Sequence, residues 1–189
     1  MHQSIYERPA TWNAHRYKRE YNHELFTDML FEEYTEFTEA KTLPNKLDGL
    51  ADMFFISIGA LWKLGETPYT YLYRQHQPVL KYPLEVPAYP SGLTGVVNRI
   101  LELGDSTLDL LQLRGLLACL LDSINDEFIC LGCTETEAEL AITIVCDSND
   151  TKLAYNLKSH DKGDLKADGF IPPNKRLQLL AEAIQDEEV

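Results

Sequence analysis

Residues 31–62 read FEEYTEFTEAKTLPNKLDGLADMFFISIGALW, and this stretch decides the predicted fold. It holds two helical patterns separated by a short break at Leu43-Pro44-Asn45. Two helices joined by so short a turn run antiparallel and side by side, so their faces meet. Apolar residues at three- and four-residue steps give the first helix an inward seam. They are Phe26, Leu30, Phe37 and Ala40.

Acidic side chains fall on the predicted inner faces of both helices. Glu33 lies within the seam of the first helix, and Glu36 lies one turn further on. In the second helix Asp52 directly precedes the apolar run at 53–56, and Asp48 lies one turn before it. A carboxylate buried without a partner costs several kcal/mol or takes up a proton. The pattern therefore predicts that these carboxylates share a partner.

A metal cation is the expected partner. Lys41 and Lys46 lie at the helix ends, too far along to neutralise the middle of the pair. Oxygen ligands without His or Cys nearby favour hard ions, which makes Mg²⁺ the first expectation and Mn²⁺ the second. The competing interpretation is a solvated acidic face. The seam position of Glu33 and the apolar flank of Asp52 weigh against it.

The acidic pattern also resembles a known family. E-E-x-x-E over Glu32–Glu36, a short loop, and D-x-x-x-D over Asp48–Asp52 resemble the all-α nucleoside triphosphate pyrophosphohydrolases. That group includes MazG-like proteins, phosphoribosyl-ATP pyrophosphohydrolase and dimeric dUTPases, and phage-encoded MazG-like members resemble this chain most. Many members read E-x-x-D in the second helix, where this chain has Gly49 at the E position. The resemblance implies that Mg²⁺ is held against a triphosphate by Glu33, Glu36, Asp48 and Asp52.

The composition limits the number of domains, the kind of partner and the location that can be expected. With 189 residues, 44% hydrophobic and 25% charged, the chain is expected to form one all-α domain over residues 1–189. Its net charge of −13 argues against a nucleic-acid polymer as partner but allows a single nucleotide. No apolar run is long enough for a membrane span, and the N-terminus lacks an apolar signal region. No membrane partner and a cytoplasmic location (host cytoplasm if phage-encoded) are therefore expected.

Four cysteines are predicted to be buried thiols: Cys119, Cys130, Cys133 and Cys146. The C-x-x-C at 130–133 has no second pair and no neighbouring His, so a metal or redox role is not expected.

Two segments flank the predicted core. Residues 67–92 are rich in Tyr and Pro and form an insertion, either a strap packed on the bundle or an aromatic lid. Self-association into a homo-oligomer through this segment is left open. Residues 158–173 form a polar C-terminal loop with lysines that could reach a phosphate. A short helix opening at Pro172-Pro173-Asn174 follows it.

Helices are also predicted over 93–104 and 107–131, the second capped by Ser106 or Thr107 and central because it is apolar almost all round. A shift of 66 residues lays parts of 31–62 on this region, with Arg99 and Arg114 standing where two of the acids stand. This would be a degenerate second helix pair that has lost its metal site, with cations in place of the metals. Dimeric dUTPases are similar in pairing an active with a degenerate half. This internal similarity implies a four-helix bundle within the monomer.

Thr134 and Glu137 form a capping box for a further helix, which runs through Val145. Residues 148–152 then read SNDTK and resemble the S-N-M-S-K block of phage MazG-like proteins. The resemblance implies that Asn149 and Lys152 face the nucleotide. An amide and a cation at one helix end can hold a phosphate, although they are also ordinary C-terminal capping chemistry.

The resulting expectation is Mg²⁺-dependent hydrolysis of a (deoxy)nucleoside triphosphate to the monophosphate and pyrophosphate. Glu32 or Glu33 would take the proton of the attacking water. Two alternatives stay open. One is a catalytically inert helical protein that senses nucleotides, which Gly49 favours. The other is a structural or regulatory helical oligomer whose acids are surface charge.

Overall fold

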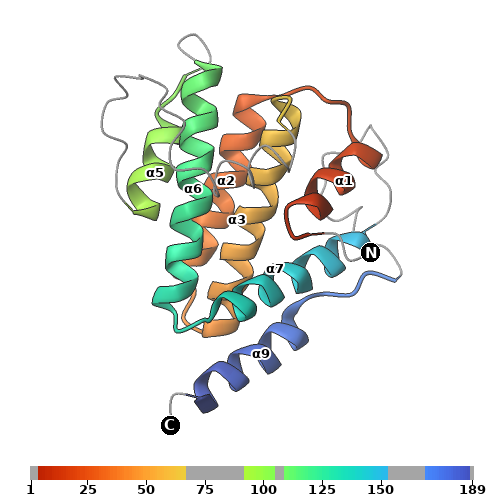
Figure 1. The fold of residues 1–189 in the computed structure, drawn as a ribbon, viewed down its shortest axis with the longest axis vertical. Coiled ribbons are helices and arrows are strands. Elements are labelled where there is room, and N and C mark those ends of the chain that lie inside the picture. The colour runs from red at the N-terminus through yellow and green to blue at the C-terminus, as the bar shows by residue number, and fades with distance from the viewer. Residues whose placement is uncertain (1–3, 67–91, 105–108, 153–168, 188–189) are drawn as a thin grey trace.

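A computed structural model describes residues 4–66, 92–104, 109–152 and 169–187, and within these ranges its regular structure is entirely helical. The prediction of an all-α helical bundle is confirmed (Figure 1). The Tyr/Pro insertion and most of the 158–173 loop lie outside the described residues. None of the described helices is long and apolar enough to cross a membrane. The helices are α1 (Glu7–Arg16), α2 (His23–Glu39), α3 (Leu43–Lys63), α5 (Leu93–Leu101), α6 (Leu110–Cys130), α7 (Glu135–Asp150) and α9 (Asn174–Glu187).

The helix pair α2–α3 begins and ends at local signals. The side chain of Asn22 accepts a hydrogen bond from the Leu25 N–H at 2.9 Å and caps α2. Gly65, with φ of 93°, ends α3 in the left-handed region that favours glycine. The break between the helices lies at 40–42, three residues before its predicted place. Pro44 instead occupies the first turn of α3, where its missing N–H costs no hydrogen bond.

The central helix is α3, which contacts α1, α2, α6, α7 and α9. The prediction that 107–131 would be central is wrong, because α6 keeps an exposed face that includes Asp122 and Asp126. The leucines of α6 fill one broad face, whereas α3 carries small residues that admit neighbours from several sides. These small residues are Gly49, Ala51, Gly59 and Ala60, and all are buried.

The four helices α2, α3, α5 and α6 form a bundle within one chain, as the sequence predicted (Figure 1). The Tyr34 hydroxyl donates to Thr94 Oγ1 at 2.8 Å near the start of α5. At the other end, His23 Nε2 lies 2.7 Å from the Leu103 carbonyl. These two contacts make α5 antiparallel to α2. The start of α6 lies beside the end of α3, so these helices are antiparallel as well (Figure 1).

In the second helix pair, α6 repeats α3 in length and place, whereas α5 has 9 residues against 17 in α2. Helices α3 and α6 each have 21 residues. A shift of 66 residues moves the first residue of α3 onto Asp109, the N-cap of α6. The Asp109 carboxylate accepts from the Leu111 N–H at 2.9 Å, so the prediction of Ser106 or Thr107 as the cap is wrong.

The two arginines of the second pair have different partners. Arg114 donates to the Leu64 carbonyl and lies 3.2 Å from the Glu66 carboxylate, so it neutralises the negative C-terminal end of α3. Arg99 pairs with Glu102 of its own helix at 3.4 Å. That both arginines occupy the place of lost metals stays a prediction.

The remaining helices cross the lower and outer sides of the bundle (Figure 1). The predicted capping box of α7 is present, with Thr134 and Glu137 bonding reciprocally. The helix runs five residues beyond Val145, so Asn149 lies in its last turn. Helix α9 buries the four apolar residues predicted for its inner face, namely Leu177, Leu180, Ala181 and Ile184.

Candidate functional site

The pair α2–α3 is in close backbone contact where Gly49 faces Phe37. A Cβ added at Gly49 would lie 3.0 Å from Phe37 Cβ and 3.1 Å from both its Cα and its backbone nitrogen. Real Cβ atoms rarely come so close, and two of these neighbours are backbone atoms that cannot rotate away. Glycine is therefore what permits this approach. The position that holds a glutamate in the resembling family is a helix–helix contact in this chain.

All four predicted metal ligands lie within about one turn of this contact. Glu36 and Asp48 each come one residue before it in their helices, Glu33 comes one turn before it, and Asp52 three residues after it. At a rise of about 1.5 Å per residue, each lies within roughly 6 Å of the contact along the helix axis. Glu33, Asp48 and Asp52 are half-buried, whereas Glu36 and the predicted base Glu32 are exposed.

The carboxylates do not form a ready-made cage. In the part of the chain that the structure describes, no three His, Cys, Asp or Glu side chains are placed so that they could hold one metal ion. The antiparallel pairing brings the predicted ligands to one level of the bundle without clustering their oxygens. A shared ion would require the side chains to rotate toward one another.

Helix α7 lies over the Asp52 end of the pair. Burial raises the pKa of the Cys146 thiol to about 12; Arg8 acts in the opposite direction, while nearby acids, Asp52 among them, raise it further. Asp52 is therefore close enough to act electrostatically on Cys146. Asn149 follows Cys146 by three residues, lies on the same side of α7 and is buried. Asn149, a predicted phosphate-binding residue, therefore lies on the same side of α7 as Cys146, which is near Asp52 of α3.

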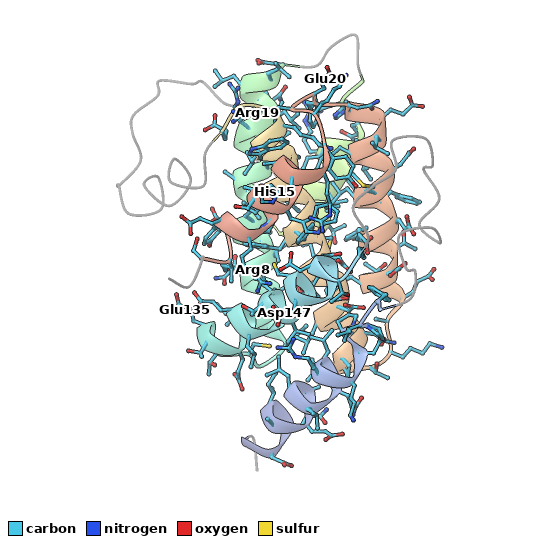
Figure 2. All side chains as sticks on the ribbon, turned by 90° about the vertical axis from the view of Figure 1, so that its right-hand side faces the viewer. Arg8, His15, Arg19, Glu20, Glu135 and Asp147 are labelled. Carbon is cyan, nitrogen blue, oxygen red and sulfur yellow. The ribbon has the colours of Figure 1, made fainter. Side chains whose placement is uncertain are left out.

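Helix α1 fixes the end of α7. Trp12 Nε1 donates to the Asn149 carbonyl at 2.9 Å in a buried hydrogen bond. Arg8 Nη2 donates to Asp147 Oδ1 at 2.8 Å and to Asp150 Oδ2 at 2.7 Å. Arg8 and Asp147 lie together where α1 approaches α7 (Figure 2). These contacts hold the last turn of α7 from one side.

Asp147 also joins α7 to α9, since Arg176 Nη1 donates to its Oδ2 at 2.5 Å. Burial alone would raise the pKa of the Asp147 carboxyl, but the hydrogen bonds from Arg176 and Arg8 outweigh it, so the pKa is lowered. One carboxylate therefore connects three helices beside the candidate site.

Sequence reasoning missed α1 and its place in the site. Asp48, Asp52, Phe55 and Gly59 succeed one another at three- and four-residue steps and form one face of α3. Trp12 packs edge-on against Phe55, with ring centroids 5.3 Å apart. A Cβ at Gly59 would lie 2.8 Å from the side-chain nitrogen of Asn13. Helix α1 thus covers the continuation of the carboxylate face. The available signal was the helical spacing of Pro9, Trp12, Asn13 and Arg16.

A separate cavity of about 230 Å³ lies at the α2–α3 turn, against the ends of α6 and α9. None of the predicted site residues lines it. Its lining consists of Lys41, Thr42, Leu43, Lys46, Leu131, Ile184 and Gln185.

The cysteines are all free thiols. Cys133 and Cys146 are buried and Cys119 is half-buried, but Cys130 is exposed, so the prediction of buried thiols is wrong for Cys130. Burial raises the pKa of Cys133 to about 11, which keeps it protonated at neutral pH.

Comparison of the chain with models of protein families, with curated proteins and with solved structures found no match. The features that bear on function are therefore the acidic motif over Glu32–Asp52, the block at 148–152 and the packing of their helices.

Proposed function

We propose that the protein is a Mg²⁺-dependent nucleoside triphosphate pyrophosphohydrolase, which cleaves the bond between the α and β phosphates. The observation that supports this most is the close contact between the acidic helices α2 and α3, with α7 packed on α3 near Asp52. The ligand of such a site carries both a metal ion and phosphate groups. The acidic pair suits the ion, while Asn149 and Lys152 suit the phosphates.

The proposed ligands of Mg²⁺, or of Mn²⁺ in its place, are Glu33, Glu36, Asp48 and Asp52. Their oxygens are the donors that hard cations prefer, and they come from two helices held at one level. Three are half-buried, so a cation would relieve the mutual repulsion of their charges. When bound, the ion would neutralise phosphate charge and lower the pKa of the attacking water.

The protein's own groups have distinct proposed tasks. Glu32, or Glu33 where it is not fully used as a ligand, takes the proton of the attacking water on a carboxylate oxygen. Asn149, whose carbonyl is fixed by Trp12, and Lys152 orient the phosphates from the α7 side. The in-line geometry that hydrolysis requires would come from holding the triphosphate at both ends.

The experiment is a screen of all ordinary and deoxy nucleoside triphosphates with Mg²⁺, in which monophosphate plus pyrophosphate is scored against diphosphate plus phosphate. Glu36→Gln and Asp52→Asn should abolish pyrophosphate release. Matched controls are Asp28→Asn, two turns before Glu36 on α2, and Asp126→Asn on α6, which should retain wild-type activity. Full activity in either ligand variant would refute the assignment of the site.

A second candidate is a nucleotide sensor without catalysis. The observation in its favour is that Gly49 packs on Phe37, so the position of the family glutamate offers no ligand. A sensor would show a rise in melting temperature with Mg²⁺ and a nucleoside triphosphate but no product, because a ligand bound only by the native state stabilises it. A structural oligomer with acids as surface charge would show neither effect.

A further inference from the structure

Arg16 is a half-buried cation with a weak set of partners. Its guanidinium carbon lies 4.4 Å from the centre of the Trp12 ring. One of its five N–H donors, on Nη2, reaches the Lys152 carbonyl at the long distance of 3.4 Å. Its Nε is buried and has no hydrogen-bond acceptor. In the part of the chain that the structure describes, no carboxylate forms an ion pair with Arg16.

The neighbouring arginines have two hydrogen-bond partners each, at shorter distances than the single partner of Arg16. Residues 8–19 contain four Arg or Lys and no Asp or Glu, in a chain whose net charge is −13. Arg8 donates to two carboxylates of α7 at 2.8 and 2.7 Å. Arg19 donates to the Trp62 and Glu66 carbonyls at 2.7 and 3.2 Å, at the end of α3. Partial burial of a charged group is unfavourable when the group lacks such partners. Arg16 therefore has N–H donors left that could bind an anion.

Arg16 also lies beside Asn149 and Lys152, the candidate phosphate-binding residues. The Trp12 ring beneath its guanidinium is the same ring that donates to the Asn149 carbonyl. That ring rests on Phe55, which lies one turn beyond Asp52 on α3. Arg16, Asn149 and Lys152 are therefore arranged around one tryptophan, at the end of the face that carries the acidic residues.

We propose that Arg16 binds a phosphate group of a polyphosphate ligand, next to Lys152. Its planar fork can donate two parallel hydrogen bonds to one phosphate, which a lysine cannot do. That the polyphosphate belongs to a nucleotide rests on the proposed function; that Arg16 binds phosphate rests on its own contacts. A ligand that spans from the acidic residues to Arg16 would have a metal-bound end and an end held by guanidinium.

The competing role is structural, since Arg16 stacks on Trp12 and lies near the negative end of α7. Arg16→Met separates the two roles because it keeps an unbranched apolar stem over the ring and removes the charge. Arg16→Lys keeps a positive charge without the fork. Arg19→Met is the matched control, since Arg19 stacks on Trp62 in the same basic run but donates to the Trp62 and Glu66 carbonyls.

The experiment is titration calorimetry of the full chain with inorganic tripolyphosphate, with and without Mg²⁺, and thermal unfolding of each variant. Arg16→Met should weaken tripolyphosphate binding by about tenfold to a hundredfold, the range of a charge-assisted hydrogen bond. The affinity of Arg16→Met for tripolyphosphate should also fall less steeply with salt concentration than that of the wild type. Arg16→Lys should lie between Arg16→Met and wild type, and Arg19→Met should bind as wild type does.

Equal affinity of wild type and Arg16→Met for tripolyphosphate, or no binding by the wild type, would overturn the proposal. A lower melting temperature with unchanged affinity would assign Arg16 a structural role only. If binding depends on Arg16 but no nucleoside triphosphate is hydrolysed, the proposed function fails and the Arg16 site stands. If hydrolysis by Arg16→Met has wild-type kcat and KM, the Arg16 site fails and the proposed function stands.

Discussion

Replacing Gly49 by alanine tests the helix contact at the centre of the candidate site. The new Cβ would meet Phe37 Cβ, Cα and nitrogen at 3.0–3.1 Å, so α2 and α3 must separate by a few tenths of an ångström. Overpacking of this kind costs about 1–3 kcal/mol. Alanine in place of glycine in a helix interior contributes about 0.5–1 kcal/mol in the opposite direction. We expect Gly49→Ala to lower the free energy of unfolding by about 1 kcal/mol.

The assay is urea unfolding followed by circular dichroism, with the slope compared between variants to confirm that only stability has changed. For a chain of this size, a loss of about 1 kcal/mol lowers the melting temperature by roughly 2–4 °C. A double mutant with Phe37→Ala sharpens the test, since alanine keeps all three contacting atoms. The strain of Gly49→Ala should therefore persist in the double mutant. The changes in the free energy of unfolding of the two single variants should add, apart from any contribution of the lost Phe37 ring.

Gly59→Ala is the matched comparison, because its new Cβ would meet the end of the Asn13 side chain at 2.8 Å rather than backbone. Asn13→Ala should relieve that strain, although it also removes the 2.8 Å hydrogen bond to the Pro9 carbonyl. A Gly49→Ala variant more stable than wild type by the full helix-propensity gain would refute the close contact. In the same test, Gly49→Glu should lose more stability than Gly49→Ala and gain no Mg²⁺-dependent rise in melting temperature.

Three other predictions address the surrounding fold. Because the pKa of Asp147 is lowered in the folded state, its contribution is present above about pH 4 and lost as pH falls through the folded pKa. The difference in unfolding free energy between wild type and Asp147→Asn should therefore vanish in acid, and a difference constant with pH would contradict this. Leu120→Asp should unfold the chain, because Leu120 is 0% exposed and an unpaired buried charge costs more than about 4 kcal/mol. Leu110→Asp, on the same helix but 47% exposed, should retain the helical circular dichroism spectrum, and a folded Leu120→Asp would show the bundle interior to be misassigned. A thiol reagent at neutral pH should modify exposed Cys130 and spare Cys146, whose pKa is raised to about 12, until the protein is unfolded; rapid labelling of Cys146 in the native protein would contradict its burial.

The sequence predicted elements whose signals are local. Asn22, the Thr134–Glu137 box and Gly65 each act within three or four residues of their own position, so their effects can be read without the fold. The cap of α6 was missed for a related reason. Ser106, Thr107 and Asp109 are all competent caps within four residues, and local chemistry does not rank them.

The remainder depends on contacts between segments far apart in the chain. Helix α1 has ten residues, too few for strong helical stability alone, and it is held by Phe55, Gly59 and the last turn of α7. The sequence alone shows only that Gly49 stands where the resembling family has a glutamate. Its neighbour Phe37 becomes evident once the register of the two helices is known. The partners of Arg16 could not be predicted for the same reason.

One face of α3 packs into the hydrophobic core, and the other carries the candidate site residues. Leu50, Phe54 and Leu61 belong to the hydrophobic core, whereas Asp48 and Asp52 lie on the opposite side of the helix, about half a turn away. The second helix pair packs on α2–α3 within the same chain, so this apolar side is covered without a partner subunit. Because the carboxylates contribute little to that core, their substitution need not disturb the bundle. A loss of activity in a folded carboxylate variant would therefore report on the site, and the stability variants described above would report on the scaffold.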